Sequence, residues 1–464
     1  MTIRRESARV LVVGGGGAGL RAALAAADVL SPADVLLVSR GRLGRSGCTA
    51  LAYSDRMAFH VALPTTPPGG ADAWRSHADD IYRMGGEVSD YRLAETLARN
   101  GAAAFEYLAR LGVPFKRRPD GTPDQFITDG SKYPRACYTG PDTAVQIENA
   151  LMGEFARRGM KALTGWSIAE IIIDGGETAG AVLVSGSGEI MAVAASAVIL
   201  ATGGPGGVFY HNAYPGGMMG EGHRAALTAG AELVNVEFIQ LGICSVKTKL
   251  ACSGSLFRAL PRLVDEDDTE ILPHYLRVGS PRPAELVFRK GASWPVSAEE
   301  PTFMIDVAAA ETVSSGRRLF LDFSKSSCFE PADHGLDFSE YHREGAPEVL
   351  KLPTPLARLN AINPQVVDWF AKRGILLERG DRIEIAPSAQ HFQGGIRINP
   401  SAETALPGLF ACGEAAGGQH GANRPGGNAL LDTQVMGRIA GEAAARRAGG
   451  RRVPDARTPG DAVD

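Results

Sequence analysis

The sequence predicts an α/β fold, in which a Rossmann-like nucleotide-binding domain made of two sequence segments carries an inserted α+β capping domain. Three observations predict it. An apolar run at residues 10–13, typical of a buried parallel strand, is followed by a glycine-rich loop at 14–19 and a helical stretch. A second such run at 35–38 completes a strand–helix–strand unit. From about 240 to 385 the periodicity weakens and prolines are frequent, and strongly patterned sequence resumes at Ser388.

The glycine content also indicates binding loops. The chain has 464 residues, 44% hydrophobic and 22% charged, so it can bury a large core. Its 57 glycines exceed the usual share of about 7%. Because glycine lets a backbone approach a ligand closely, clusters of glycine mark loops that contact one. Twenty-four of them fall in six short segments, at residues 14–19, 41–47, 203–207, 216–222, 394–395 and 413–427.

The composition excludes several functional classes. Lysine and arginine (48) nearly balance aspartate and glutamate (52), and a net charge of −4 offers no attraction to nucleic acid or anionic lipid. The six cysteines form no C-x-x-C pair, so we expect no metal site. No apolar run reaches the length of about 18 residues needed to span a membrane. We therefore expect a cytoplasmic protein with neither nucleic acid nor membrane as a partner, and we do not interpret Arg4-Arg5 as an export signal.

The elements that follow are predicted from their periodicity. Residues 72–111 carry apolar side chains at spacings of three, four and seven, which is typical of helices, and a further helix carries apolar positions from Ala144 to Phe155. The next segments are short strands separated by turn residues, which predict a β-meander returning to the main sheet. These strands are residues 168–173, 179–184 and 198–201. The polar tail at 449–464 is expected to be disordered.

The loop between the first strand and the first helix has the spacing G-x-G-x-x-G, met by Gly14, Gly16 and Gly19. The first glycine permits the tight turn, the second admits a pyrophosphate close to the backbone, and the third allows close packing of helix on strand. The acidic residue that usually holds the adenosine ribose after the second strand is missing. Ser39 and Arg40 stand there instead, which weakens a simple NAD interpretation.

Five blocks of the sequence resemble the FAD-dependent family that contains the flavoprotein subunits of fumarate reductase and succinate dehydrogenase, and L-aspartate oxidase. The resemblance covers most of the chain up to about residue 445. It is carried by the glycine loop at 12–23, by SRGRLGRSGCTA at 39–50, by ATGGPGGVFY and GAELVNVEFIQ between 201 and 240, by QHFQGGI at 390–396, and by LPGLFACGEAAGGQHGANRPGGNALL at 406–431.

The resemblance implies that FAD binds to a domain made of residues 1–239 and 386–448, with a capping domain at 240–385 over the flavin. It implies that Glu414 holds the ribityl chain and that Asn428 opens a final helix. The positive end of that helix would stabilise charge on the reduced flavin. The expected FAD-binding residues are Gly14, Gly16, Ala18, Gly19, Ser39, Arg40, Ser46, Gly47, Cys48, Thr49, Ala201, Thr202, Gly203, Gly413, Glu414, Asn428, Ala429 and Leu430.

The mode of FAD attachment follows from the second block. Some members of the family bind FAD covalently through a histidine in this block, and residues 45–49 contain none. We therefore expect non-covalent FAD. Cys48 could in principle be a thiol attachment or redox site, but we interpret it as a small packing residue.

Two residues match positions at which the family holds a substrate carboxylate over the flavin. They are His391 in QHFQGGI and Arg424 in HGANRPGGN, and we expect both to be catalytic and to bind substrate. An arginine suits this task because its planar fork can bind a carboxylate through two hydrogen bonds. Arg424 could instead tie the capping domain to the FAD domain. His420 is a further candidate for substrate binding, with bracing of the turn before Asn423 as an equal alternative.

Three polar groups of the family are absent. The arginine of the R-D-x-V block is replaced by Ile305, the histidine after E-F-x-Q is missing from 241–243, and the Thr-Glu pair falls in 252–260, which contains no acid. The resemblance therefore does not extend to succinate–fumarate chemistry or to a true aspartate oxidase, and no residue is evident that replaces the arginine. Arg258, Lys247 and Tyr275 lie in the capping region, where we expect solvated surface positions.

Together these features predict an FAD-dependent oxidoreductase that transfers a hydride between flavin N5 and a small carboxylate- or amine-bearing metabolite, as a dehydrogenase, an oxidase or a C=C reductase. The chain lacks the C-terminal helical domain of larger members, so we do not expect a respiratory role. We expect oxygen or a small carrier as the electron acceptor, with a homo-oligomer as a possible assembly. The alternatives are a flavin monooxygenase, for which no second GxGxxG loop is present, and a non-catalytic FAD-binding protein that serves as a partner in a complex.

Overall fold

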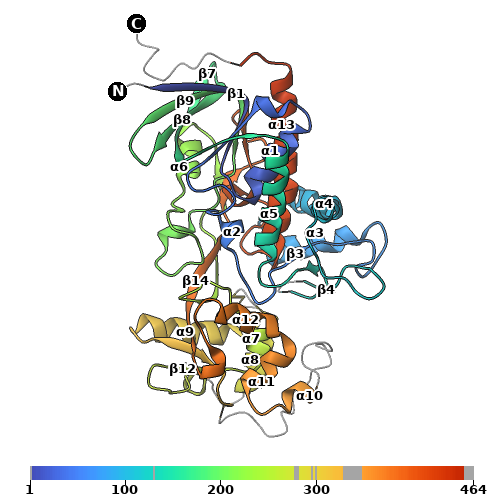
Figure 1. Ribbon diagram of the computed structural model, residues 1–464, viewed down its shortest axis with the longest axis vertical. Coiled ribbons are helices and arrows are strands. Elements are labelled where there is room, and N and C mark those ends of the chain that lie inside the picture. The colour runs from blue at the N-terminus through green and yellow to red at the C-terminus, as the bar shows by residue number, and fades with distance from the viewer. Residues whose placement is uncertain are drawn as a thin grey trace.

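The computed structural model describes residues 3–128, 131–275, 282–293, 296–297, 300–327 and 347–453. These residues form two lobes, each with its own hydrophobic core (Figure 1). The large lobe has a core drawn from residues 8–231 and 396–448, and the cap lobe has a core drawn from residues 243–385. Residues 454–464, most of the tail predicted to be disordered, lie outside the described residues.

A mixed seven-stranded sheet forms the centre of the large lobe. Its order is β6-β2-β1-β9-β8-β7, and β16 pairs with the second half of β9. Strands β6, β2, β1 and β9 are parallel, whereas β7, β8 and β9 form the predicted antiparallel meander. The strands are β1 (Arg4–Val13), β2 (Val35–Ser39), β6 (Lys161–Thr164), β7 (Trp166–Asp174), β8 (Glu177–Ser185), β9 (Ile190–Leu200) and β16 (Leu409–Ala411).

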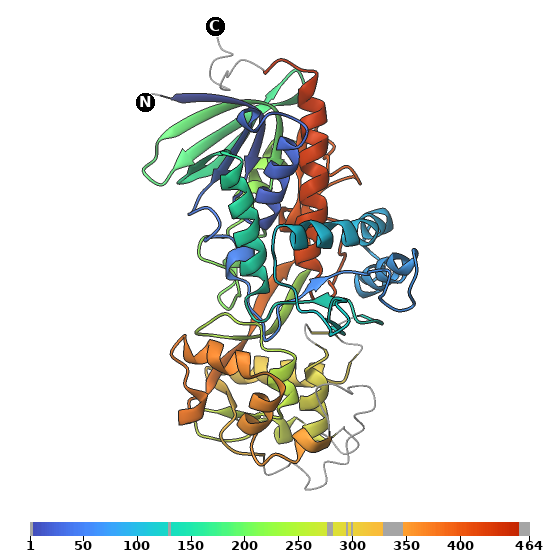
Figure 2. The same ribbon diagram turned by 45° about the vertical axis from the view of Figure 1, so that its right-hand side comes forward.

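Helices α1 (Gly17–Ala27), α5 (Thr143–Arg157) and α13 (Asn428–Gly449) lie side by side next to this sheet (Figures 1 and 2). Helix α13 approaches α1 closely because it presents glycines to it. A Cβ atom on Gly441 would lie 2.2 Å from the carbonyl oxygen of Ala22. The helical region predicted at 72–111 is two helices, α3 (Ala73–Met84) and α4 (Tyr91–Arg110), because Gly86 between them has a φ of 67°.

The remaining elements of the large lobe are short. They are α2 (Cys48–Leu51), α6 (Glu221–Thr228), the 3-10 turns η1 (Pro32–Asp34), η2 (Gly206–Val208) and η5 (Gly413–Ala415), and two small sheets. One sheet consists of β3 (Phe59–His60), β5 (Ala136–Cys137) and β4 (Gln125–Phe126), and the other of β10 (Leu233–Val234), β15 (Gly395–Arg397) and β17 (Ala416–Gly417).

The cap lobe is α+β, as predicted. Its four-stranded antiparallel sheet has the order β11-β14-β13-β12, formed by β11 (Ile239–Ser245), β14 (Ile383–Phe392), β13 (Leu319–Asp322) and β12 (Arg262–Asp265). Its helices are α7 (Ser255–Arg258), α8 (Pro283–Lys290), α9 (Phe303–Ser314), α10 (Pro347–Leu350), α11 (Pro355–Ile362) and α12 (Pro364–Ala371), with 3-10 turns η3 (Leu272–His274) and η4 (Leu377–Arg379).

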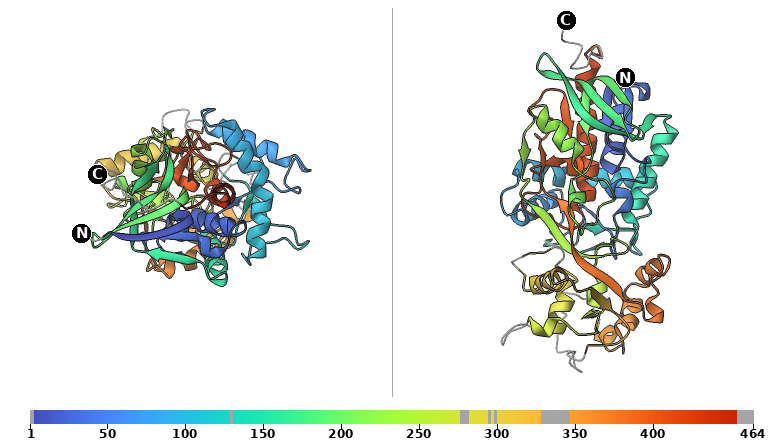
Figure 3. Two further views of the ribbon diagram at one scale, coloured as in Figure 1. Left: turned by 90° about the horizontal axis from the view of Figure 1, so that it is seen from above. Right: turned by 90° about the vertical axis from the view of Figure 1, so that its left-hand side faces the viewer.

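A two-stranded ribbon of β11 and β14 connects the lobes. The strands run side by side from one lobe into the other (Figure 3). The predicted domain boundaries at residues 240 and 385 both fall inside these strands, which belong to the cap sheet at one end and reach the large lobe at the other. The register places Gln240 opposite His391 at the large-lobe end of the ribbon.

Within the described residues, no helix is long and apolar enough to cross a membrane.

A buried carboxyl group on α5 makes stability depend on pH. Glu148 is fully buried, and neither carboxylate oxygen has a hydrogen-bond partner in the described part of the chain. Burial raises the pKa of Glu148 from 4.5 to about 8. Because the unfolded chain ionises near its ordinary pKa, this group opposes folding increasingly as the pH rises from 4.5 to about 8.

We expect Glu148→Gln to raise the free energy of unfolding by about 3 kcal/mol at pH 7, because glutamine has no proton to take up on folding. At pH 4.5 the two proteins should unfold at nearly the same urea concentration. Urea unfolding at both pH values measures the difference. A gain of equal size at both values would show that the carboxyl group titrates normally.

Candidate active site

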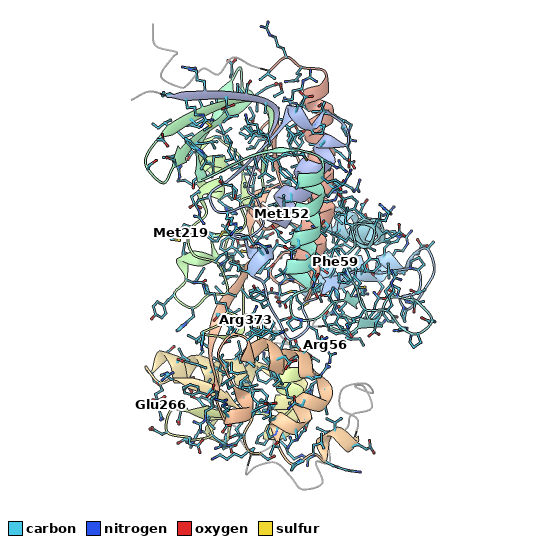
Figure 4. All side chains as sticks on the ribbon, viewed as in Figure 1. Arg56, Phe59, Met152, Met219, Glu266 and Arg373 are labelled. Atoms are coloured by element: carbon cyan, nitrogen blue, oxygen red, sulfur yellow. The ribbon has the colours of Figure 1, made fainter. Side chains whose placement is uncertain are left out.

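A cavity of about 350 Å³ lies where the two lobes meet. Its walls come from the loop between β1 and α1, the segments after β2 and β9, the start of α13, the large-lobe end of β14 and the cap loop around α7. Arg56, at the junction of the lobes in Figure 4, is one of its lining residues. Parallel strands and two helix N-termini therefore converge on one space, as ligand sites of doubly wound sheets do.

The glycine loop forms the wall at the start of α1. Gly14 has a φ of 122°, and a Cβ there would lie 2.1 Å from the carbonyl oxygen of Ala201. A Cβ on Gly19 would lie 1.8 Å from the carbonyl oxygen of Gly14, so the third glycine is needed for packing. Gly16, in contrast, lines the cavity, and the nearest atom to its Cβ position is the hydroxyl oxygen of Thr49 at 4.0 Å.

Both helix N-termini at the cavity follow a glycine. Gly16 precedes α1 and Gly427 precedes α13, so neither N-cap residue has a side chain that accepts from the first turn, and the N–H of Gly17 donates to the hydroxyl of Thr49 at 3.3 Å. A helix N-terminus has partial positive charge and N–H donors, so it stabilises anions. An FAD pyrophosphate fits the first and the pyrimidine edge of a flavin fits the second, where Ala429 and Leu430 line the cavity.

Glu414 lies on the cavity wall between these two ends. Its carboxylate accepts hydrogen bonds from the hydroxyl of Tyr214 and from the backbone N–H of Phe392, the latter at 2.8 Å. Burial raises the pKa of Glu414 to about 7. A Cβ on Gly204 would lie 2.6 Å from this carboxylate, so the glycine leaves the room that Glu414 needs.

Most of the residues expected to bind FAD therefore share one cavity. Lining residues among them are Gly14, Gly16, Ala18, Ser39, Arg40, Ser46, Gly47, Cys48, Thr49, Ala201, Thr202, Gly203, Glu414, Ala429 and Leu430. The other three, Gly19, Gly413 and Asn428, do not line the cavity. The side-chain oxygen of Asn428 is within hydrogen-bond distance of two buried imidazoles, His60 Nδ1 at 2.9 Å and His77 Nε2 at 3.0 Å.

Arg424 and His391 also line the cavity. Arg424 is 3% exposed, and its guanidinium donates to the side-chain oxygens of Gln240 at 2.7 Å and Gln390 at 3.1 Å. The amide of Gln240 in turn donates to the backbone oxygen of Arg424 at 2.8 Å. Arg424 thus lies on the cavity wall with its orientation set by the ribbon strands β11 and β14.

His391 is buried beside it as a neutral imidazole. Burial, followed by the charge of Arg424 and by His420, holds the pKa of His391 well below its usual value of 6.5. Its Nδ1 atom has no hydrogen-bond partner among the described residues. A neutral ring can accept a hydrogen bond from a ligand in the cavity, and burial and the Arg424 charge make it a weaker base than a free imidazole.

His420 does not line the cavity. Its ring is 5.8 Å from that of His391 and its Nε2 atom is 3.7 Å from a carboxylate oxygen of Asp432 on α13. The backbone of His420 contacts Gly85, where a Cβ would lie 2.5 Å from its carbonyl oxygen. These contacts place His420 behind His391.

The expectation for Arg258 is wrong. Arg258 is 7% exposed and lines the cavity from the cap side, together with Asp55 from the large lobe. Lys247 is exposed, as expected, and Tyr275 is half-buried against the cap core. Ile305 is fully buried in the cap core and does not reach the cavity. No periodic pattern marks α7, which is a single turn, so the sequence had no signal that its arginine faces inward.

The family model described as FAD binding domain matches residues 9–258 and 330–430. Over 446 residues the chain is 32% identical to one of the subunits of the CoM/CoB fumarate reductase of Methanothermobacter marburgensis, covering 95% of this chain and 72% of that protein. It is 28% identical to the 8-methylmenaquinol:fumarate reductase flavoprotein subunit of Wolinella succinogenes, covering 95% of this chain and 65% of that protein.

Solved structures show the same similarity. Sdh1 of Mycobacterium smegmatis in complex with UQ1 matches with a TM-score of 0.73 and 28% identity, covering 98% of this chain and 70% of that one. A variant of the quinol fumarate reductase of Escherichia coli matches with a TM-score of 0.73 over 97% of this chain and 71% of that one. Its identity is 24%, so this second match concerns the fold.

Proposed function

Because this chain belongs to the FAD-binding family of the fumarate reductase and succinate dehydrogenase flavoproteins, and is thus an FAD-dependent oxidoreductase, we propose that it moves a hydride between flavin N5 and a small carboxylate- or amine-bearing metabolite. The observation that supports this proposal is the buried Arg424, held by two glutamines on the cavity wall beside a neutral His391. FAD, when bound, supplies the hydride-accepting ring.

Each residue has a distinct task in this proposal. Arg424 binds the substrate carboxylate through its guanidinium and so fixes the reacting carbon over the ring. Gln240 and Gln390 fix the guanidinium. His391, which lines the cavity, accepts the proton that leaves the substrate when the reaction runs as a dehydrogenation. The N-termini of α1 and α13 would hold the pyrophosphate and the flavin.

The proposal also covers the identity of the substrate and of the electron acceptor. Ile305 stands where the resemblance implies an arginine, and it lies inside the cap core, so it has no contact with a ligand in the cavity. We therefore propose a substrate other than succinate, and oxygen or a small carrier as acceptor. Reoxidation in air of the reduced protein, followed by stopped flow, tests the acceptor, because an oxidase reoxidises within seconds.

Anaerobic titration tests the function. The purified protein should absorb near 450 nm, and this absorbance should bleach with one member of a panel of amino acids and organic acids but not with succinate. Bleaching by succinate at a rate typical of turnover would contradict the substrate proposal. A colourless protein that does not take up added FAD would contradict the cofactor assignment itself.

FAD should be bound without a covalent bond. Burial, followed by the Glu414 carboxylate, raises the pKa of Cys48 well above 9, so the thiol stays protonated at neutral pH and is a poor nucleophile. Acid precipitation should therefore release all of the flavin into the supernatant. Cys48→Ala should keep the same flavin content as the wild type. Flavin that stays with the pellet of the wild type but not of the variant would show a thioether bond.

A further inference from the structure

His391 is by itself a poor acceptor for a proton. Its ring is 5% exposed, and Arg424, whose guanidinium is always charged, lines the same cavity. Burial, followed by the charge of Arg424, holds the pKa of His391 well below its usual value. A proton taken up there would place a second buried cation near the first, which is unfavourable unless an anion balances the charge. A proton acceptor at this position therefore needs a carboxylate within reach.

A row of buried titratable groups connects His391 to such a carboxylate. The ring of His420 lies 5.8 Å from the ring of His391, at an angle of 80° to it. Nε2 of His420 lies 3.7 Å from a carboxylate oxygen of Asp432 on α13. His420 and Asp432 are each 1% exposed, and neither lines the cavity. The three side chains thus form a row in which His391 lines the cavity and His420 contacts the other two.

Four buried polar atoms of this row have no hydrogen-bond partner in the described part of the chain. They are Nδ1 of His391, both ring nitrogens of His420 and Oδ1 of Asp432. The other carboxylate oxygen accepts a hydrogen bond from the side-chain amide of Gln419 at 3.1 Å, which fixes the carboxylate. Buried polar atoms are normally paired, so unpaired titratable groups in contact with one another behind a cavity are typical of a functional site.

His420 is the better base of the two histidines. Burial lowers the pKa of His420 below 6.5, but the carboxylate of Asp432 opposes this change. At His391 burial is followed by the charges of Arg424 and His420, which lower the pKa further. A proton that reaches His391 is therefore expected to move to His420, where the carboxylate of Asp432 stabilises it.

We propose that His420 and Asp432 form a buried relay that takes over, from His391, the proton that leaves the substrate. The inference rests on the proposed function, because His391 must first accept that proton. In a dehydrogenation the substrate loses a hydride, with two electrons, to flavin N5 and a proton to His391. Transfer of this proton to His420 returns His391 to its neutral form and leaves an ion pair of His420 with Asp432. In the reverse direction the same proton returns to the substrate.

His420 and Asp432 act through His391, so they are positioning residues, and the first measurement titrates the rings themselves. Protein loaded with FAD and labelled with 15N in its histidine rings is followed by NMR from pH 4 to 8, with His391→Asn and His420→Asn for assignment. The ring of His420 should take up a proton at a higher pH than that of His391. In Asp432→Asn, which keeps an acceptor for Gln419, the proton affinity of His420 should fall at least tenfold. An unchanged proton affinity would overturn the relay, and this result requires no substrate.

The second measurement follows flavin reduction by stopped flow from pH 5 to 9, with the acid or amino acid of the panel that bleaches the flavin. Asp432→Asn should lower the rate constant on the high-pH plateau at least tenfold, because the relay becomes a weaker base. The pH of half-maximal rate should move to a lower value, because His420 then loses its proton at lower pH. A purely structural role of Asp432 would lower the rate without moving this pH.

The other charged groups near the relay are accounted for. Arg424 stays charged throughout this range. Burial lowers the pKa of His77 on α3 to about 3, and burial, followed by Asp432, raises the pKa of the Cys412 thiol. Both groups therefore stay neutral. Glu414 on the cavity wall has a pKa of about 7, so the variant is compared with the wild type at each pH.

Glu442→Gln is the matched control. Glu442 is another carboxylate of α13, but it pairs with Arg438 at 3.0 Å and does not line the cavity, so the variant should behave as the wild type in both measurements. If no member of the panel reduced the flavin of the wild type, the proposed function would fail. If the wild type were reduced and Asp432→Asn kept both its rate and its pH of half-maximal rate, only the relay would fail.

Discussion

Replacing Arg424 with methionine is expected to lower kcat/KM for flavin reduction by the substrate about a thousandfold. Methionine keeps the apolar stem of the side chain but removes the charge that we expect to bind the carboxylate. Loss of a buried, charge-assisted contact of this kind costs about 4 kcal/mol, which corresponds to that factor. Stopped-flow bleaching of the flavin under anaerobic conditions measures it directly.

The variant also removes the donor to Gln240 and Gln390, so folding must be checked separately. FAD content and melting temperature should stay close to the wild-type values. Arg424→Lys, which keeps a charge but not the planar fork, should fall between the two proteins. Arg397→Ala is a suitable control, because Arg397 is exposed on β15 and pairs with the exposed Glu232. Full activity of Arg424→Met would leave Arg424 a structural link between the lobes.

Replacing Gly16 with leucine is expected to remove FAD from a folded protein. Gly16 has a φ of −87° and a ψ of −173°, an extended conformation that any residue adopts, so the change adds no backbone strain. Its side chain would enter the cavity at the start of α1, where the pyrophosphate is expected. We expect the Kd for FAD to rise at least a hundredfold, about 2.7 kcal/mol.

Substitutions at two other glycines distinguish an effect on FAD binding from an effect on folding stability. Gly19→Ala places a methyl group 1.8 Å from a backbone oxygen, so we expect it to lower the stability of the protein even before FAD is added. Gly153→Ala, in α5 with no atom within 4 Å of the new Cβ, should raise stability by about 0.5–1 kcal/mol. Circular dichroism of the apoproteins distinguishes the three effects. Tight FAD binding by Gly16→Leu would show that the pyrophosphate lies elsewhere.

The fold of the large lobe could be predicted because its signals are local. The strand at 10–13, the glycine loop and the following helix are contiguous, and their chemistry is visible in the order of residues. The meander likewise follows from alternating short strands and glycine turns. The distant Arg424 and His391 were found only because short motifs surround them, since nothing in the local pattern brings residue 391 to residue 14.

The structure of the cap lobe was harder to predict from the sequence, because its contacts join residues that are far apart in the chain. Asp55 accepts a hydrogen bond from the backbone N–H of Ser255 at 2.8 Å, but the two are 200 positions apart, and each alone looks like an ordinary polar residue. The inward position of Arg258 depends on that contact and on the space left by Gly291. His420 is the reverse of Arg258. It lies in a sequence motif and was a candidate site residue, but its packing against Gly85 and Asp432 places it behind the cavity wall.

The sequence by itself determined the nucleotide-binding fold and the cofactor, and it singled out Arg424, because each depends on short motifs whose backbone geometry is local. Only the tertiary structure decided which cap arginine lines the cavity. That choice depends on a carboxylate of one lobe capping a helix of the other, on Gly254 and Gly291, which leave room for the Asp55 carboxylate and the Arg258 side chain, and on the burial of Ile305 in the cap core. Contacts between distant segments create these features, and no single segment carries them.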